Sequence, residues 1–100
     1  MSYATVFQQH LRLAILRVLD EMPGCKANSS ILHSAMETLG FSATRDTVRN
    51  ELAWLAEQNL VVCSDTSMTS LVIATLTERG GDVAAGRAVA PGVQRPTPRG

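Results

Sequence analysis

The chain has 100 residues, of which 45% are hydrophobic, so it holds enough apolar side chains for one small core and too few for two ordinary domains. Nine basic and nine acidic residues cancel, which excludes a general attraction of the whole chain to phosphate backbones or anionic membranes. The charges are unevenly divided, since residues 1–78 carry five basic and eight acidic side chains, while residues 79–100 carry four arginines and one aspartate.

Cellular location is inferred from cysteine usage and apolar runs. Cys25 and Cys63 belong to no closely spaced motif, and the chain begins without a basic segment followed by an apolar secretory core. A reducing, cytoplasmic setting is therefore expected. The longest apolar run, at residues 71–75, has the length of a strand, far below the roughly 20 residues of a membrane helix. No membrane association is predicted.

Two helices are expected in the first 40 residues. Thr5 and Gln8 fit a capping box, and apolar residues then recur at helical spacing as far as Pro23-Gly24, which ends the first helix. After a loop at residues 25–27, Asn28 or Ser29 can cap a second helix that ends at Gly40. Only four residues, 40–43, separate this helix from the next one, which is the spacing of a helix-turn-helix.

The third helix is expected over residues 44–58, with Thr44 as its N-cap and Asn59 as its terminator. Residues 60–64 and 69–76 are rich in β-branched side chains and flank the polar turn 65–68, which predicts a hairpin. Thr77 can cap a short fourth helix, which Gly80 and Gly81 weaken by about 1 kcal/mol each relative to alanine. These elements form one domain at residues 1–86, followed by a flexible tail rich in Pro, Gly and Arg at residues 87–100.

The order of helix, helix, helix and hairpin, with "TRDTVRNELAWLAEQNLV" before the first strand and "LTERG" after the second, resembles the winged helix-turn-helix superfamily. The run "LTERGGDVAAGR" also resembles small uncharacterised proteins of Mu-like bacteriophages and prophages. The resemblance implies a mainly α fold with a small β-hairpin: a three-helix core, a wing and a short fourth helix. Many winged helices bind DNA, whereas others dimerise or dock onto proteins.

The outward face of the third helix supplies the candidate binding residues. With about 100° per residue and Val48 at the buried centre, Asp46, Asn50, Ala53 and Glu57 point outward, flanked by Arg45 and Arg49 on one side and by Thr47 and Trp54 on the other. Arg49 and Asn50 suit guanine and adenine edges, while Thr44, Arg45 and Thr47 lie where the first turn meets phosphates or bases. The nucleic-acid-binding residues are therefore predicted to be Thr44, Arg45, Thr47, Arg49 and Asn50.

Other features oppose DNA binding. Asp46 and Glu57 share the outward face, and residues 63–70 of the hairpin carry neither Lys nor Arg, although a wing that follows the backbone generally needs one. Ordinary Arg–Asp pairing on a solvated face would explain the charges equally well. Trp54 is read as part of the core or of a subunit contact more readily than as a base-stacking platform.

The sequence offers little for catalysis. His10 and His33 lie on separate helices, and there is no nucleophile motif or phosphate-cradling glycine loop. The two cysteines and two histidines have no chelating spacing, so neither a metal site nor a cofactor is expected, and no residue is assigned as catalytic.

Two hypotheses remain. The first is a phage or prophage DNA-binding protein, a transcriptional regulator in the host cytoplasm that places helix 44–58 in the major groove of double-stranded DNA. The alternative is a non-enzymatic adaptor that binds a phage or host protein. A homodimer is also expected, with the first helix as the preferred contact, together with the fourth helix, because Leu13 and Leu16 extend the apolar surface of the first helix. The predicted buried residues are Leu11, Ile15, Val18, Leu32, Met36, Val48, Leu52, Leu55, Leu60 and Ile73.

Overall fold

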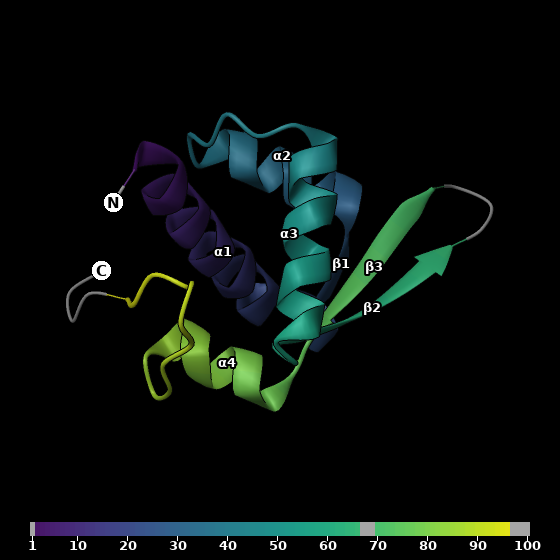
Figure 1. Ribbon diagram of the computed structural model, residues 1–100. Coiled ribbons are helices and arrows are strands. Elements are labelled where there is room, and N and C mark those ends of the chain that lie inside the picture. The colour runs from purple at the N-terminus through teal and green to yellow at the C-terminus, as the bar shows by residue number, and fades with distance from the viewer. Residues whose placement is uncertain (1, 67–69, 97–100) are drawn as a thin grey trace.

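The computed structural model describes residues 2–66 and 70–96 and shows a small domain of mixed α and β structure (Figure 1). In the described part of the chain, four α-helices accompany a three-stranded antiparallel sheet with the strand order β1-β3-β2. The elements are α1 (Tyr3–Glu21), the 3-10 turn η1 (Pro23–Cys25), β1 (Lys26–Asn28), α2 (Ser29–Thr38), α3 (Arg45–Glu57), β2 (Val61–Thr66), β3 (Leu71–Leu76) and α4 (Glu78–Ala85).

Most of the helix ends follow the predicted caps. The side chains of Asn28, Thr44 and Thr77 each accept a hydrogen bond from the backbone N–H three residues later, at 2.8, 3.0 and 2.9 Å. Asn59 adopts the left-handed conformation after α3, with φ 63°. The first helix differs, because Ser2 rather than Thr5 is its cap and accepts from the Thr5 N–H at 3.3 Å. The capping box at Thr5 and Gln8 is therefore wrong.

The predicted loop at residues 25–27 is largely a strand. Residues 26–28 pair antiparallel with residues 73–75, so β1 turns the predicted two-stranded hairpin into a three-stranded sheet. Such a short strand has almost no sequence signal of its own, since its pairing partner lies more than 40 residues further along the chain. The hairpin itself is confirmed, with β2 and β3 in register from Val61↔Leu76 to Thr66↔Leu71. Part of its predicted turn, residues 67 and 68, lies outside the described residues.

The core lies between α1, α2, α3 and the inner face of the sheet. Eight of the ten residues predicted to be buried are buried, and Val18 and Ile73 are only half-buried. The prediction for Ile73 is wrong because successive side chains of a strand point to opposite faces of the sheet. Ala74 is fully buried, with Val72 and Leu76 packed against the core, so Ile73 points to the other face. A continuous apolar run conceals this alternation.

The second apolar surface of α1 is not free for a partner. Leu13 and Leu16 belong to the chain's own core, with exposed fractions of 7% and 0%. Figure 1 shows why, because α4 and the segment that follows it lie along the side of α1. Leu13 and Leu16 therefore cannot take part in the predicted dimer contact.

The segment after α4 also departs from the expected flexible tail. Ala90 and Val93 are buried, and the backbone N–H of Gln94 donates to the carbonyl of Gln9 on α1 at 3.1 Å. The expected flexibility does not hold for this part of the segment, because two small apolar side chains suffice to dock it when α1 and α3 already supply a partner surface. The last four residues of the predicted tail, 97–100, lie outside the described residues. In the described part of the chain, no helix has both the length and the apolar character needed to cross a membrane.

Candidate functional site

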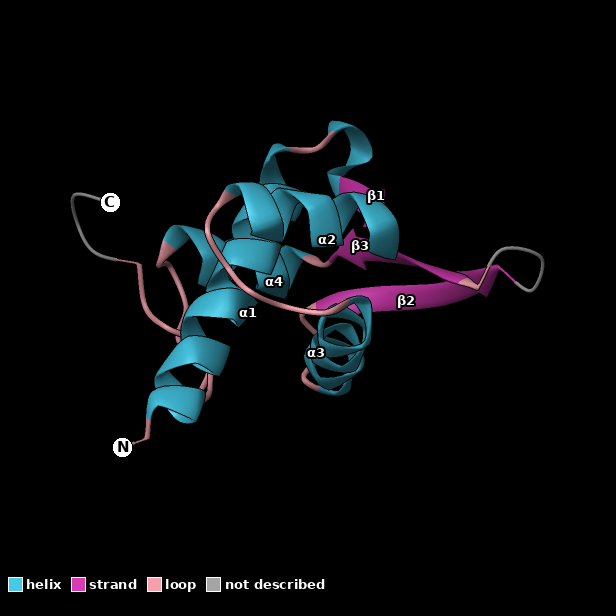
Figure 2. Cartoon of the chain, turned by 90° about the horizontal axis from the view of Figure 1, so that it is seen from above, coloured by secondary structure: helices cyan, strands magenta, loops and turns pink. Residues whose placement is uncertain are grey.

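The helix α3 lies at one edge of the domain, with the hairpin on one side and α1 on the other. Figure 2 shows this helix nearly end-on, with the β2–β3 ribbon extending past it. Its outward face carries Asp46, Asn50, Ala53 and Glu57, all of them exposed, as the helical spacing predicts. The opposite stripe of Val48, Leu52 and Leu55 is buried and anchors the helix in the core. The outward face of α3 is therefore held in place by the core and open to solvent.

Arg45 and Arg49 meet in one hollow, on the flank of α3 that faces the sheet. This hollow has a volume of about 120 Å³ and is lined by Ser29, Ser30, Arg45, Arg49, Ser70 and Leu71. Ser29 and Ser30 come from the first turn of α2, whereas Ser70 directly precedes β3 and Leu71 begins it, so three separate elements converge here. None of the lining residues is acidic, which leaves the two guanidinium groups as the charges of the hollow.

Neither arginine is neutralised within the described part of the chain. Arg45 and Arg49 have no ion pair with a described residue, although Asp46 is next to Arg45 in sequence and also exposed. The expected alternative of Arg–Asp pairing on a solvated face is therefore not formed. Two exposed cations thus stand side by side on the flank of α3.

The predicted threonines lie elsewhere and perform a different task. Thr44 accepts from the Thr47 N–H, and the two hydroxyl oxygens are 2.9 Å apart. Their first role is thus to cap α3, since this interaction satisfies an N–H that has no acceptor within the helix. Asn50 stands alone on the outward face. Of the five predicted site residues, the structure therefore brings only the two arginines together in the hollow. The two threonines contact each other at the start of α3.

The side of α3 that faces α1 is held by a cluster that the sequence did not reveal. Arg12 donates from Nε to Oε1 of Glu51 at 2.7 Å and from Nη1 to the carbonyl of Gly92 at 3.0 Å. Its guanidinium carbon also lies 3.8 Å from the centre of the Trp54 ring. With exposed fractions of only 12% for the Arg12 side chain and 6% for that of Glu51, the pair is largely desolvated, and loss of one partner would leave an uncompensated charge. This cluster locks α3 to α1.

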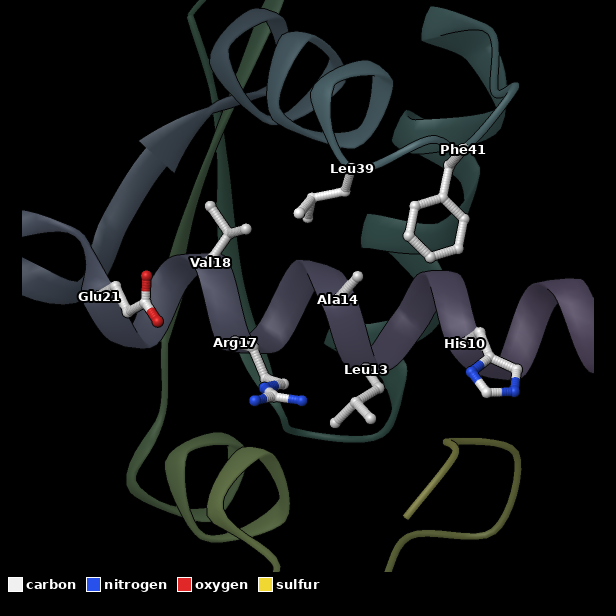
Figure 3. A pocket seen from close by; sticks show the side chains of 8 residues that line it. All are labelled: His10, Leu13, Ala14, Arg17, Val18, Glu21, Leu39 and Phe41. Atoms are coloured by element: carbon white, nitrogen blue, oxygen red, sulfur yellow. The ribbon is translucent and has the colours of Figure 1, made fainter. Parts of the chain in front are cut away.

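A hollow of about 430 Å³ lies along α1. Figure 3 shows His10 and Glu21 at opposite ends of it, with Ala14, Leu39 and Phe41 between them. Eleven positions on a helix correspond to about 16 Å, so the imidazole and the carboxylate cannot act on one substrate atom. Among residues 2–66 and 70–96, no group of three or more His, Cys, Asp or Glu side chains is arranged to hold a metal ion.

The cysteines are free thiols, both half-buried. Burial, and to a smaller extent the charge of Asp65, raises the pKa of the Cys63 thiol. A raised pKa reduces the thiolate fraction at neutral pH, which is the opposite of what a nucleophilic cysteine requires.

Sequence reasoning missed Ser29, Ser30 and Ser70 as members of the site. Ser29 and Ser30 follow the cap Asn28 directly, so they were visible as first-turn residues of α2. Their position beside Arg45 and Arg49 depends on the packing of α2 against α3, which no local pattern encodes.

Comparison with known proteins gives two relatives. The chain is 43% identical over 94 residues to the protein named "Uncharacterized protein gp26" of Escherichia phage Mu, which covers 94% of this chain and 95% of that one. It is 37% identical over 79 residues to an uncharacterized protein of Haemophilus influenzae, covering 79% of this chain and 76% of the relative. No family model matches the chain. The resemblance to Mu-like phage proteins is confirmed, and the chain belongs to the same family as gp26 of phage Mu.

Proposed function

We propose that this protein binds double-stranded DNA through α3 and regulates transcription for a Mu-like phage or prophage, in the cytoplasm of the host. The order α1, α2, α3, hairpin and α4 supports an assignment to the winged helix-turn-helix superfamily, with β2 and β3 as the wing. In this arrangement α3 enters the major groove, which is wide enough to admit one helix.

The proposal rests on the exposure of Arg45 and Arg49 and on their lack of ion pairs with described residues. Both are exposed on the same flank of α3, both line one hollow without a carboxylate, and neither has an ion pair with a described residue. Unpaired guanidinium groups that converge on one surface suit phosphate oxygens and base edges. Because the chain is neutral overall, this local group of cations has to supply the attraction to DNA.

The test is binding of a fluorescent random-sequence duplex, followed by anisotropy over a salt series. The affinity should fall linearly with salt concentration on logarithmic axes, because phosphate contacts release counterions. Arg45→Ala should weaken binding to every sequence and lower the salt slope by about one. Arg79→Ala is the matched control, since it removes one exposed cation from α4, away from α3.

Asp46→Asn provides an independent arm of this test. The carboxylate of Asp46 is exposed on the face that would meet phosphates, so its removal should strengthen binding to random DNA. A wild-type protein and an Asp46→Asn variant that both fail to bind duplex at low salt would refute the proposal.

The alternative is a protein adaptor that uses the same face. Asp46 and Glu57 on the outward face favour it, because a protein partner with basic side chains tolerates them better than DNA does. Loss of DNA binding in the experiment above, together with an unperturbed fold, supports this second candidate.

Dimerisation remains part of the proposal, since a dimer would place two α3 helices at half-sites about 34 Å apart. The contact cannot be Leu13 or Leu16, which are buried in the monomer. Sedimentation equilibrium in the presence and absence of duplex measures the oligomeric state directly. A monomer under both conditions would remove the dimer from the proposal.

A further inference from the structure

The hollow between α2, α3 and the start of β3 has the size and chemistry of a site for one tetrahedral oxyanion. Its volume of about 120 Å³ is several times the roughly 10 to 15 Å³ that one water molecule requires, which leaves room for a phosphate group. It is lined by two arginines from α3 and by the three serines Ser29, Ser30 and Ser70.

The hydrogen-bond donors of this hollow are partly oriented already. Ser29 is buried, and its Oγ accepts from the backbone N–H of Val72 at 3.2 Å. This bond fixes the oxygen and leaves the hydroxyl hydrogen free to donate. The Asn28 cap is used by the N–H of Ile31, so the N–H of Ser30, in the first turn of α2, has no acceptor within the helix.

The charges around these donors all favour an anion. The first turn of α2 contains no acidic residue, and the hollow contains none either. Arg45 and Arg49 have no ion pair with a described residue. A phosphate in the hollow would therefore meet two guanidinium groups, serine hydroxyls and the positive end of α2 at once.

We infer that this hollow binds one phosphate group of the DNA backbone, and that Arg49 contacts this phosphate instead of a base edge. The inference rests on the proposed function, because it assumes that the phosphate belongs to a duplex held by α3. It changes the role predicted for Arg49, since a guanidinium directed into the hollow lies on the flank of α3 and not on its outward face. Contacts to base edges then fall to Asn50, so sequence discrimination by α3 is modest.

The first experiment uses inorganic phosphate without DNA. The ¹⁵N-labelled protein is titrated with sodium phosphate at constant ionic strength, with sodium chloride as the reference salt. Amide resonances of Ser29, Ser30 and Ser70 should shift with phosphate and not with chloride, and Arg49→Ala should abolish the shifts while Arg79→Ala keeps them. Absence of phosphate-specific shifts in the wild-type protein would overturn the site.

The second experiment compares a random duplex with a duplex selected for tight binding. Arg49→Ala should weaken both by the same factor, roughly ten- to a hundredfold, which corresponds to the loss of a charge-assisted hydrogen bond. If Arg49→Ala weakens only the selected duplex, Arg49 contacts a base and the inference is wrong. If phosphate binds in the hollow but no duplex is bound, the DNA function fails and the hollow is an anion site for another ligand, which overturns the assignment to DNA.

Ser30→Asp separates binding from folding. A carboxylate in the first turn of α2 should stabilise the helix through its dipole and should also repel a phosphate in the hollow. The melting temperature should therefore stay the same or rise while DNA affinity falls, and Ser30→Ala is the neutral control. Unchanged DNA affinity in Ser30→Asp would contradict a phosphate at this position.

Discussion

The fourth helix contains two adjacent glycines that should respond to the same substitution with opposite signs. A Cβ atom on Gly80 would clash with the carbonyl oxygen of Leu60 and lie 2.7 Å from Cδ1 of Leu76, whereas a Cβ on Gly81 would meet nothing closer than 3.8 Å. Gly80 is buried and supports the close approach of α4 to the chain that precedes β2. Intrinsic helix propensity treats both positions alike.

The expected magnitudes follow from these distances. Gly81→Ala should raise the free energy of unfolding by about 0.5 to 1 kcal/mol, because alanine loses less backbone entropy in a helix. Gly80→Ala gains the same stabilisation from helix propensity, but its new methyl group must displace neighbouring backbone, and such overpacking costs about 1 to 3 kcal/mol. It also strains the two hydrogen bonds that Thr77 donates to the Leu60 carbonyl, at 3.1 and 3.0 Å, each with a net contribution of about 1 kcal/mol. Gly80→Ala should therefore lower stability by about 2 kcal/mol.

The assay is urea unfolding followed by circular dichroism, with both variants measured beside the wild-type protein. A difference of about 3 kcal/mol between the two variants corresponds to at least 10 °C in melting temperature for a domain of this size, at roughly 4 to 8 °C per kcal/mol. Equal m-values would show that the denatured state is unchanged. If Gly80→Ala proves as stabilising as Gly81→Ala, the close approach of α4 to Leu60 is wrong and propensity alone governs this helix.

Three further predictions concern the core, a thiol and the C-terminal segment. Leu52→Ala should lower the free energy of unfolding by about 2 to 5 kcal/mol in chemical denaturation, because the side chain is 1% exposed; an unchanged midpoint would refute the assigned core. Cys63 should react with iodoacetamide more slowly than Cys25 at mildly alkaline pH, because burial raises its pKa and lowers its thiolate fraction. Equal rates for the two thiols would count against this pKa shift. Gly92→Ala should reduce the hydrogen-exchange protection of the Gln94 amide, because the position has φ +92° and a Cβ would lie 2.9 Å from the tryptophan ring of α3. Full protection in that variant would mean that the segment docks without this close contact.

The sequence by itself determined the helices, the hairpin and the face that α3 presents to solvent. Each of these depends on local physics: apolar spacing along a helix, a cap that binds an N–H three residues later, or a terminator such as Asn59 in the left-handed conformation. Such signals lie within a few residues of one another. They could be recognised at Thr44 and Thr77 before any tertiary contact was known.

Only the tertiary structure decided which distant residues meet. Three features join residues that are far apart in the chain: the pairing of β1 with β3, the hydrogen bond from Arg12 to the carbonyl of Gly92, and the hollow that Ser29 and Arg49 both line. The pattern of residues along the sequence does not predict these contacts, because their free energy depends on how α1, α2 and α3 pack. For the same reason the segment after α4 looked unable to fold: its two buried side chains are too few to form a core, and they are stabilised by a surface that the rest of the domain provides.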